Sequence, residues 1–442
     1  MQDDCETAVH GQVPKGNDHT TNLQGEETPL LNGGSVDVSD TSSSQGLNHA
    51  WIAMLVTTPI FMGYSTLLSF QSKIKNRMGI TDQSSHDSYT FGVAVGFIFL
   101  GNLCFRLLHN VVFSMLRPRH RVMVSYTCVA ASISLIATMI FAVGSSAMWV
   151  IFVSYLLAGV GIGCFEANIL SCMTPLGHNV KKWAVLGMPV GYNGTSILGF
   201  LVFYMVAEWI PDKHIDAQCG VFFAAAGCNV VGLLMFATLI PDVRYEASED
   251  TLLTWIKDLR KFKEWIPLMW QPCLALFVDM FAVIMLSSIQ QYIFNLDEVP
   301  LWPGSHKSVG KNLLLLLLNA FGLIGDAAGR VFAYEFRKGK VPRSPLIFLP
   351  LCILALGLGL SKVMLLAPVS QLFALFANGC IYATTTKYVD SYVPRAFNLI
   401  ALSVWLFSGD LGSFIAANAV TPVLSNVGIV ATAAPPPSPS PQ

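Results

Sequence analysis

The sequence predicts an all-α polytopic membrane protein with about eleven transmembrane helices in a 6+5 arrangement. Of its 442 residues, 53% are apolar and only 12% are charged, whereas a soluble globular chain carries about 25% charged residues. Apolar runs close to the roughly 20 residues that a membrane-spanning helix needs recur along most of the chain. The longest internal polar stretch, residues 241–266, separates six of these runs from the last five.

Eleven segments fit that length and composition. We expect them at residues 49–70, 88–112, 123–145, 148–173, 184–207, 219–240, 267–293, 312–334, 345–361, 366–388 and 397–420. The short gap at Gly144–Ala147 predicts a tight hairpin between the third and fourth helices.

Polar segments divide the chain into domains. We expect a disordered cytosolic tail at 1–48, a first six-helix bundle at 49–240, a cytosolic linker at 241–266, a second five-helix bundle at 267–420 and a low-complexity tail at 421–442. Loops on the side of the N-terminus carry more than twice as many Lys and Arg residues as the opposite loops. Because cytosolic loops are enriched in these residues, we expect the N-terminus in the cytosol.

The N-terminal tail contains Glu26-Glu27-Thr28-Pro29-Leu30-Leu31. An acidic residue followed by two leucines is similar to the adaptor-binding signals of lysosomal and endosomal membrane proteins. Glu26, Leu30 and Leu31 therefore predict sorting adaptors as partners. We expect the chain in either the plasma membrane or a lysosomal or endosomal membrane, with the lipid bilayer around it.

Composition and motifs argue against several function classes. The net charge of −1 provides no basic field to attract nucleic acid. The sequence contains no Gly-x-x-x-x-Gly-Lys-Ser/Thr loop, no hydrolase elbow and no zinc-ligand spacing. We therefore predict neither an enzyme nor a cofactor or metal site. The ten cysteines lie mostly within apolar runs, as is typical of small packing residues.

Asp326 and Arg330 are the main candidates for substrate binding. They lie four residues apart within an apolar run, so they share one face of a helix. Ionisable residues within a bilayer are costly and indicate a functional site by default. A carboxylate accepts hydrogen bonds from hydroxyls and a guanidinium donates to oxygens, which suits a polar solute. The alternative is an ion pair that neutralises itself and holds neighbouring helices.

Glu166 and Asn378 are further candidates for substrate binding. Glu166 follows closely spaced glycines in the fourth run, where it either contacts substrate, couples transport to protons, or lies partly hydrated near the cytosolic end of the helix. Asn378 lies in the middle of the tenth run, where its amide bonds either a ligand or a neighbouring helix.

Asp410 is the second candidate for proton coupling. It is an acid within the eleventh apolar run, where it either pairs with Arg330 or Arg106 or takes up a proton. Asp279 in the seventh run is a similar but weaker candidate. Arg106 lies toward the cytosolic end of the second run, where a long side chain can extend to the membrane surface.

The second half of the sequence resembles the equilibrative nucleoside transporters, best from Asn319 to Ser413. The resemblance rests on Asp326-x-x-Gly-Arg330 in the eighth run, Pro345–Cys352 in the ninth, Phe376-Ala-Asn-Gly379 with Lys387 in the tenth, and Gly409 and Gly412 in the eleventh. It implies a fold related to the major facilitator class, in which two bundles rock about a site near the middle of the membrane.

The resemblance also implies facilitated transport of nucleosides or nucleobases, with Asp326 and Arg330 meeting ribose hydroxyls. Three features depart from the family. Its Asn-x-Phe-Asp lead-in is displaced, with Asn319 and Phe321 about one helical turn early. Its Pro-Trp-Asn motif is reduced to Pro59, and Glu166 stands where an uncharged polar residue is usual. These departures leave open a different substrate or a proton-coupled one.

Two other functions remain open. Gly161-x-Gly-x-x-Glu166 is faintly similar to the lysosomal protein battenin, a distant relative of the same family. The alternative function is therefore that of a battenin-like lysosomal or endosomal membrane protein with a different small-molecule substrate. The other possibility is a receptor or scaffold that transports nothing. A scaffold gains little from several ionisable groups within lipid.

Overall fold

The computed structural model describes residues 49–80, 85–210, 213–242, 256–257, 260–294, 298–335, 344–394 and 397–426. The tail at 1–48 with its predicted sorting signal, most of the linker at 241–266, and the C-terminal tail beyond 426 lie outside the described residues.

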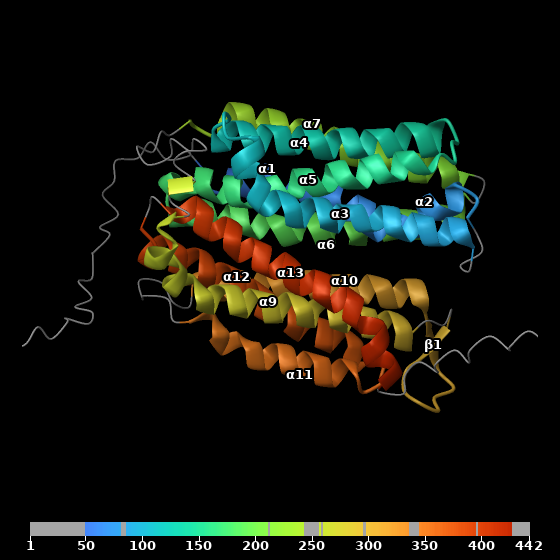
Figure 1. The fold of residues 1–442 in the computed structure, drawn as a ribbon. Helices are drawn as coiled ribbons and strands as arrows, with labels where there is room; N and C mark the ends of the chain where they lie inside the picture. Colours follow the sequence, from blue (N-terminus) through green and yellow to red (C-terminus); the bar gives the residue numbers. More distant parts are fainter. Residues whose placement is uncertain are drawn as a thin grey trace, which may run out of the picture. The chain divides into compact units, whose positions relative to one another are not determined.

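Two groups of helices form the described part of the chain (Figure 1). The first contains α1 (Ile52–Ser69), α2 (Gln71–Arg77), α3 (His86–Val112), α4 (Pro118–Ile136) with a π-helical end (Ala137–Ala142), α5 (Met148–Met173), α6 (His178–Trp209) and α7 (His214–Leu239). The second contains α9 (Phe262–Ile293), α10 (Lys311–Glu335), α11 (Leu349–Gly359) after a 3-10 turn (Pro345–Phe348), α12 (Leu366–Tyr392) and α13 (Asn398–Asn426).

The predicted eleven-helix pattern is confirmed, with one short member. Within the described ranges, ten helices have the length and composition of a membrane span, and Pro345–Gly359 is a shorter apolar helix. A small antiparallel hairpin joins α9 to α10 through β1 (Glu298–Pro300) and β2 (Ser308–Gly310), with Val299 opposite Val309. No sequence pattern had indicated this hairpin.

Several helices begin earlier than their apolar runs predict. The third was expected from residue 123, but α4 begins at Pro118, because a proline in the first turn follows the extended backbone of Arg117. The fifth was expected from 184, but α6 begins at His178, directly after Gly177, whose φ is +97°. The first turns of both helices contain charged residues, so a search for apolar runs places the start of each helix too late.

The two groups repeat the same packing order. In the first group α1 packs on α6 and α3 packs on α5, and in the second α9 packs on α13 and α10 packs on α12. Counted as spans, these are the pairs 1–5 and 2–4, then 7–11 and 8–10. Such internal repeats are typical of transporter folds that place a site between their halves.

Glycine permits the close approach within these pairs. A Cβ added at Gly379 of α12 would lie 2.9 Å from Asp326 Oδ1 and 3.0 Å from the backbone nitrogen of Arg330 on α10. A Cβ at Gly163 of α5 would lie 2.6 Å from the carbonyl oxygen of Asn102 on α3. Small residues let helix backbones approach one another in a membrane. Both contacts lie beside the charged residues described below.

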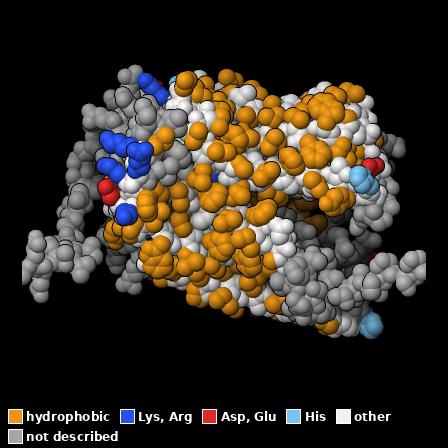
Figure 2. Space-filling model, in the orientation of Figure 1, with side chains coloured by type: hydrophobic (Ala, Val, Ile, Leu, Met, Phe, Trp, Pro, Cys, Tyr) orange, Lys and Arg blue, Asp and Glu red, His pale blue; other side chains and the backbone are white. Residues whose placement is uncertain are grey.

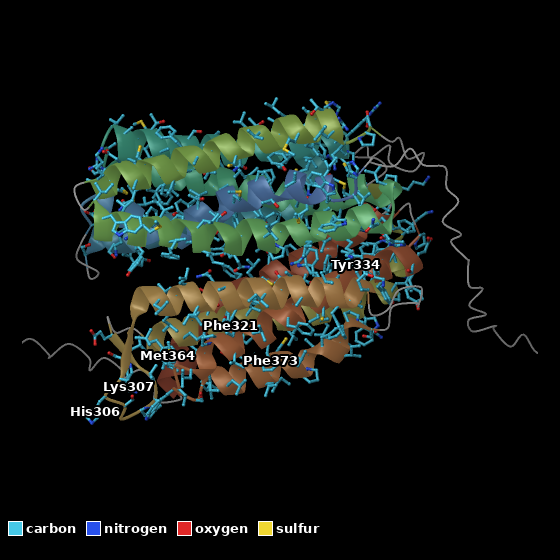
Figure 3. The ribbon with its side chains drawn as sticks, turned by 180° about the vertical axis from the view of Figure 1, so that it is seen from behind. His306, Lys307, Phe321, Tyr334, Met364 and Phe373 are labelled. Carbon is cyan, nitrogen blue, oxygen red and sulfur yellow. The ribbon has the colours of Figure 1, made fainter. Side chains whose placement is uncertain are left out.

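The two groups meet through α6 with α10 and through α3 with α13. We call the end at which α6 begins and α10 and α12 end the inner end, and the end that carries the β1–β2 hairpin the outer end. Tyr334 marks the inner end in Figure 3, and His306 and Lys307 mark the outer end. The orientation predicted from the loops makes the inner end cytosolic.

The surface agrees with a membrane setting. On the face drawn in Figure 2, hydrophobic side chains cover most of both groups, and Lys and Arg side chains gather at the inner end. Exposed basic residues at that end include Arg117, Lys257, Arg260, Lys261 and Lys263. This is the distribution that the predicted cytosolic placement of the inner end requires.

Candidate functional site

Arg106 lies between two carboxylates at the junction of the two groups. From α3, its Nε donates to Oδ2 of Asp410 on α13 at 2.6 Å, and its Nη2 is 3.0 Å from Oε2 of Glu166 on α5. Asn102, one turn earlier on the same face of α3, donates to Oδ1 of Asp410 at 3.0 Å. Arg106 is only 3% exposed. The prediction that it extends to the membrane surface is therefore wrong, because the buried Glu166 and the partly buried Asp410 hold it inside.

Asp326 and Arg330 form the expected pair on α10. Arg330 Nε donates to Asp326 Oδ1 at 2.6 Å and Nη2 donates to Oδ2 at 3.2 Å, so the contact is bidentate. The remaining terminal nitrogen of Arg330 donates to the carbonyl of Val185 on α6 at 3.1 Å. Arg330 thus bonds to both groups of helices, and the pair lies at their junction.

Tyr382 of α12 contacts both Arg330 and Glu166, the acid that pairs with Arg106. Its ring centroid lies 4.4 Å from the guanidinium carbon of Arg330, and its hydroxyl donates to Glu166 Oε2 at 3.5 Å. Its ring also packs on Trp405 of α13, with 4.8 Å between the centroids. A continuous polar path therefore runs from the Asp326–Arg330 pair through Tyr382 and Glu166 to Arg106.

We call Asp326, Arg330, Tyr382, Glu166, Arg106 and Asp410 the central network. It contains three carboxylic acids, two arginines and a neutral tyrosine, so it carries one negative charge in excess when its carboxylates and guanidiniums are all ionised. An uncompensated charge inside a membrane protein is costly unless a proton or a cation neutralises it. The network can therefore bind polar groups and has a carboxylate available for a proton.

Among the described residues, Asn378 makes no hydrogen bond to the Asp326–Arg330 pair. Its Nδ2 donates to Oδ2 of Asp279 on α9 at 2.6 Å, and Cys352 of α11 lies 3.3 Å from Oδ1 of the same carboxylate. Of the two interpretations that the sequence left open for Asn378, this bond to a neighbouring helix is the one present in the structure. Asp279 is fully buried.

Ion pairs also join the groups at the inner end. Lys181 of α6 donates to both carboxylate oxygens of Asp390 on α12, at 2.7 and 2.8 Å, and Lys182 pairs with Glu335 of α10. Between described residues of the two groups, every hydrogen bond and ion pair lies either in the central network or closer to the inner end. In the described structure, the two groups of helices are therefore held together from the central network to the inner end.

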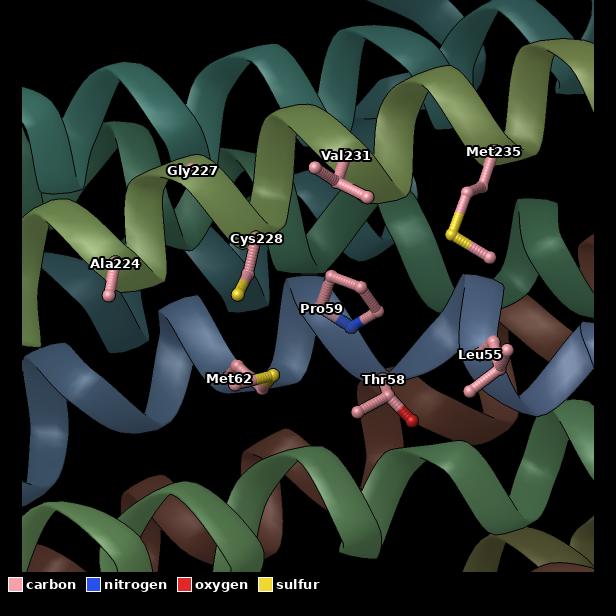
Figure 4. Close-up of a pocket in the computed structure, with 9 residues that line it drawn as sticks. All are labelled: Leu55, Thr58, Pro59, Met62, Ala224, Gly227, Cys228, Val231 and Met235. Atoms are coloured by element: carbon pink, nitrogen blue, oxygen red, sulfur yellow. The ribbon is translucent and has the colours of Figure 1, made fainter.

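An apolar groove between α1 and α7 is separate from these polar contacts (Figure 4). Its volume is about 480 Å³, and its lining includes Pro59 of α1 and Gly227 of α7 but no charged side chain. A polar solute would leave its hydrogen-bonding groups unpaired there, so the groove is not the candidate site. In the described ranges, no group of three His, Cys, Asp or Glu residues lies close enough to hold a metal ion.

Sequence reasoning missed Tyr382 and placed Arg106 incorrectly. The available signal for Arg106 was its spacing from Asn102, since two polar residues four apart in an apolar run share a helix face. Tyr382 stands four residues after Asn378, but an aromatic residue in a membrane run is normally a packing residue. Its role depends on contacts with α10, α5 and α13 that local spacing does not reveal.

Comparison with known proteins identifies the fold. No protein-family model matches the sequence, and no curated relative matches it at the significance applied. A structure of the E. coli fucose:proton symporter FucP is 12% identical, with a TM-score of 0.56 over 86% of this chain and 94% of that one. The major facilitator superfamily proton:xylose symporter XylE bound to 6-bromo-6-deoxy-D-glucose is 13% identical, with a TM-score of 0.58 over 86% and 90%.

A third similar structure is the E. coli xylose transporter XylE in a partially occluded inward-open conformation. It is 13% identical, with a TM-score of 0.52 over 83% of this chain and 89% of that one. Similarity at such low identity shows the fold alone. The chain is an integral multi-pass membrane protein with a major-facilitator-like fold, as predicted. The resemblance to equilibrative nucleoside transporters stays a prediction.

Proposed function

We propose that this protein transports a small polar solute across a membrane by alternating access. The observation that carries the proposal is the central network. All of its members are buried except Asp410, which is partly exposed, and they come from α3 and α5 of one group and α10, α12 and α13 of the other. A site built from both halves changes its accessibility when the halves rock against each other. A receptor or scaffold would gain no comparable benefit from buried charges.

The inner-end contacts support an outward-facing state. Lys181 with Asp390 and Lys182 with Glu335 hold α6 against α12 and α10 on the inner side of the central network. To release solute inward, the protein must break these pairs and separate the inner ends of the helices. The network itself then remains near the pivot while access moves from one side to the other.

A solute that carries a sugar ring suits the network best, and a nucleoside is the first candidate. The Asp326 carboxylate accepts hydrogen bonds from neighbouring hydroxyls and Arg330 donates to ring or hydroxyl oxygens. The spacing of this pair resembles that of equilibrative nucleoside transporters, and two structurally similar proteins are symporters of fucose and xylose. Hydroxyls of ribose and of these sugars present the same chemistry. Nucleobases would need other partners.

Proton coupling follows from the excess acid in the network. Asp410 is held by both Arg106 and Asn102, whereas Glu166 is held by Arg106 at 3.0 Å and by a longer bond from Tyr382. Glu166 is therefore the first candidate for the proton, and Asp410 is the second. Protonation of Glu166 would neutralise the excess charge and leave Arg106 paired with Asp410 alone.

Uptake measurements test the proposal directly. The chain carrying Leu30→Ala and Leu31→Ala, intended to retain it at the cell surface, would be supplied with radiolabelled adenosine, uridine, fucose or xylose at pH 5.5 and 7.4. We expect saturable uptake of adenosine or uridine that Asp326→Asn abolishes. Uptake of neither nucleoside, with surface expression confirmed, would exclude the nucleoside assignment and favour a battenin-like lysosomal protein with another substrate. Sugar uptake alone would assign a sugar carrier.

A further inference from the structure

Asp279 is a buried acid with no basic partner among the described residues. It lies on α9 and is 0% exposed, and among the described residues it accepts hydrogen bonds only from the Asn378 amide at 2.6 Å and the Cys352 thiol at 3.3 Å. The central network does not include it. A charged carboxylate at this position would have only neutral donors around it, which is a costly arrangement inside a membrane protein.

In the part of the chain that the structure describes, no cation pairs with Asp279 to compensate its charge. From α12 and α11 it faces the neutral Asn378 and Cys352, and from α10 the charges of Asp326 and Arg330 act on it at longer range. Arg330 already makes a bidentate contact with Asp326. The Pro345–Phe348 turn, which packs on α9, contains no charged residue, and the charged residue of α13, Asp410, bonds to Asn102 and Arg106.

The Asn378 amide is the hydrogen-bond partner that a change of protonation at Asp279 would affect first. Because a carboxylate only accepts hydrogen bonds, Asn378 must direct its NH₂ group toward Asp279, and its carbonyl oxygen accepts no bond from a described residue. A protonated Asp279 gains a donor while it keeps an acceptor, so a turned Asn378 amide can accept from it and present the NH₂ group where the carbonyl oxygen had been.

Asn378 is placed to pass this change on to a solute. It is four residues before Tyr382 on α12, so the two side chains share one helix face, and Asn378 lies one turn nearer the outer end. The next residue, Gly379, has its backbone packed against Asp326 and Arg330. A solute entering from the outer end would thus meet either an acceptor or a donor beside the Asp326–Arg330 pair.

We propose that Asp279 is a second proton-binding site, separate from Glu166 and Asp410, and that its proton sets the orientation of the Asn378 amide. Asp279 is then a positioning residue for solute recognition. The recognition part rests on the proposed transport function, whereas the proton site does not.

Infrared difference spectroscopy of the purified protein in lipid nanodiscs tests the proton site without transport. We expect a protonated-carboxyl band that appears as the pH falls, is lost in Asp279→Asn and persists in Asp410→Asn. In Asn378→Ala the band should shift, because the acid loses its hydrogen-bond partner. A pH-dependent band that is unchanged in Asp279→Asn, or no such band in the unmodified protein, would overturn the proposal.

Transport in proteoliposomes tests the recognition role. We expect the KM of the unmodified protein to change at least about threefold between pH 5.5 and 7.4, and the KM of Asp279→Asn to be independent of pH, while uptake by this variant still responds to an acid gradient. Asp279→Asn with a normal pH dependence of KM would overturn this role. If no solute is transported by any variant, the infrared result alone decides the proton site, and the failure belongs to the proposed function.

Discussion

Arg106 of α3 and Asp410 of α13 are 304 residues apart in sequence and are joined by a hydrogen bond of 2.6 Å. The same guanidinium lies 3.0 Å from Glu166. The planar guanidinium serves both carboxylates at once because its N–H groups point in fixed, different directions. One arginine of the first group thereby holds an acid of its own group and an acid of the other, and this makes the junction of the groups sensitive to charge.

Replacing Arg106 by Lys should therefore cost more than its preserved charge suggests. A single ammonium cannot reach both carboxylates with the geometry of the guanidinium. Leaving a buried carboxylate unpaired costs about 3–5 kcal/mol. We expect Arg106→Lys to lower uptake at least about tenfold and to reduce thermal stability in detergent.

Arg119→Lys provides the matched control for Arg106→Lys. Arg119 on α4 donates to two backbone carbonyls near the end of α7 and forms no ion pair with an acid among the described residues. We expect this variant to keep uptake within about twofold of the unmodified chain. Equal losses in the two variants would show that any arginine replacement is harmful, and would remove the special role of Arg106.

The ion pair between Lys181 and Asp390 should control the closed inner end. Lys181 is 1% exposed, so Asp390→Asn leaves a buried lysine without its partner and should favour separation of the inner ends. Distances between spin labels at Asn179 of α6 and Tyr392 of α12, both exposed, would report this opening. Labels attached through unnatural amino acids avoid the free cysteines of the described chain.

Lys182→Met is the comparison for that experiment. The Lys182–Glu335 pair is more exposed, with side-chain exposures of 17% and 51%. Exposed pairs contribute about 0–1 kcal/mol. We expect a longer label distance in Asp390→Asn and little change in Lys182→Met. An unchanged distance in Asp390→Asn would mean that helix packing, and not this pair, keeps the inner end closed.

Gly379→Ala should damage the Asp326–Arg330 pair through the backbone. The added Cβ would lie within 3.0 Å of both residues, and overpacking of this kind costs about 1–3 kcal/mol. We expect a lower denaturation temperature and reduced uptake. Gly357→Ala on α11 is the control, because a Cβ there meets nothing within 4 Å. Equal stability of the two variants would contradict the close packing of α10 on α12.

The number and order of the helices follow from the sequence because membrane spans need about 20 apolar residues. The pairing of Asp326 with Arg330 follows as well, because it is local to one helix turn. The partner of Asp410 does not follow, since Arg330 and Arg106 were equal candidates until α13 was placed beside α3. The isolation of Asp279 likewise depends on which side chains α11 and α12 bring to α9.

Replacing Glu166 by Gln should separate solute exchange from proton coupling. Gln keeps an acceptor for Arg106 and for the Tyr382 hydroxyl but carries no titratable charge. Because acid on the outer side favours the neutral form of Glu166, we expect uptake by the unmodified protein to rise as outer pH falls. In Glu166→Gln, an acid gradient should no longer drive accumulation, while exchange of labelled for unlabelled solute continues. Proteoliposomes with a controlled pH difference measure both. Glu166 and Asp410 share Arg106 as their partner, so either acid can take the proton that the network needs. If the gradient still drives accumulation in Glu166→Gln but not in Asp410→Asn, the proton belongs to Asp410.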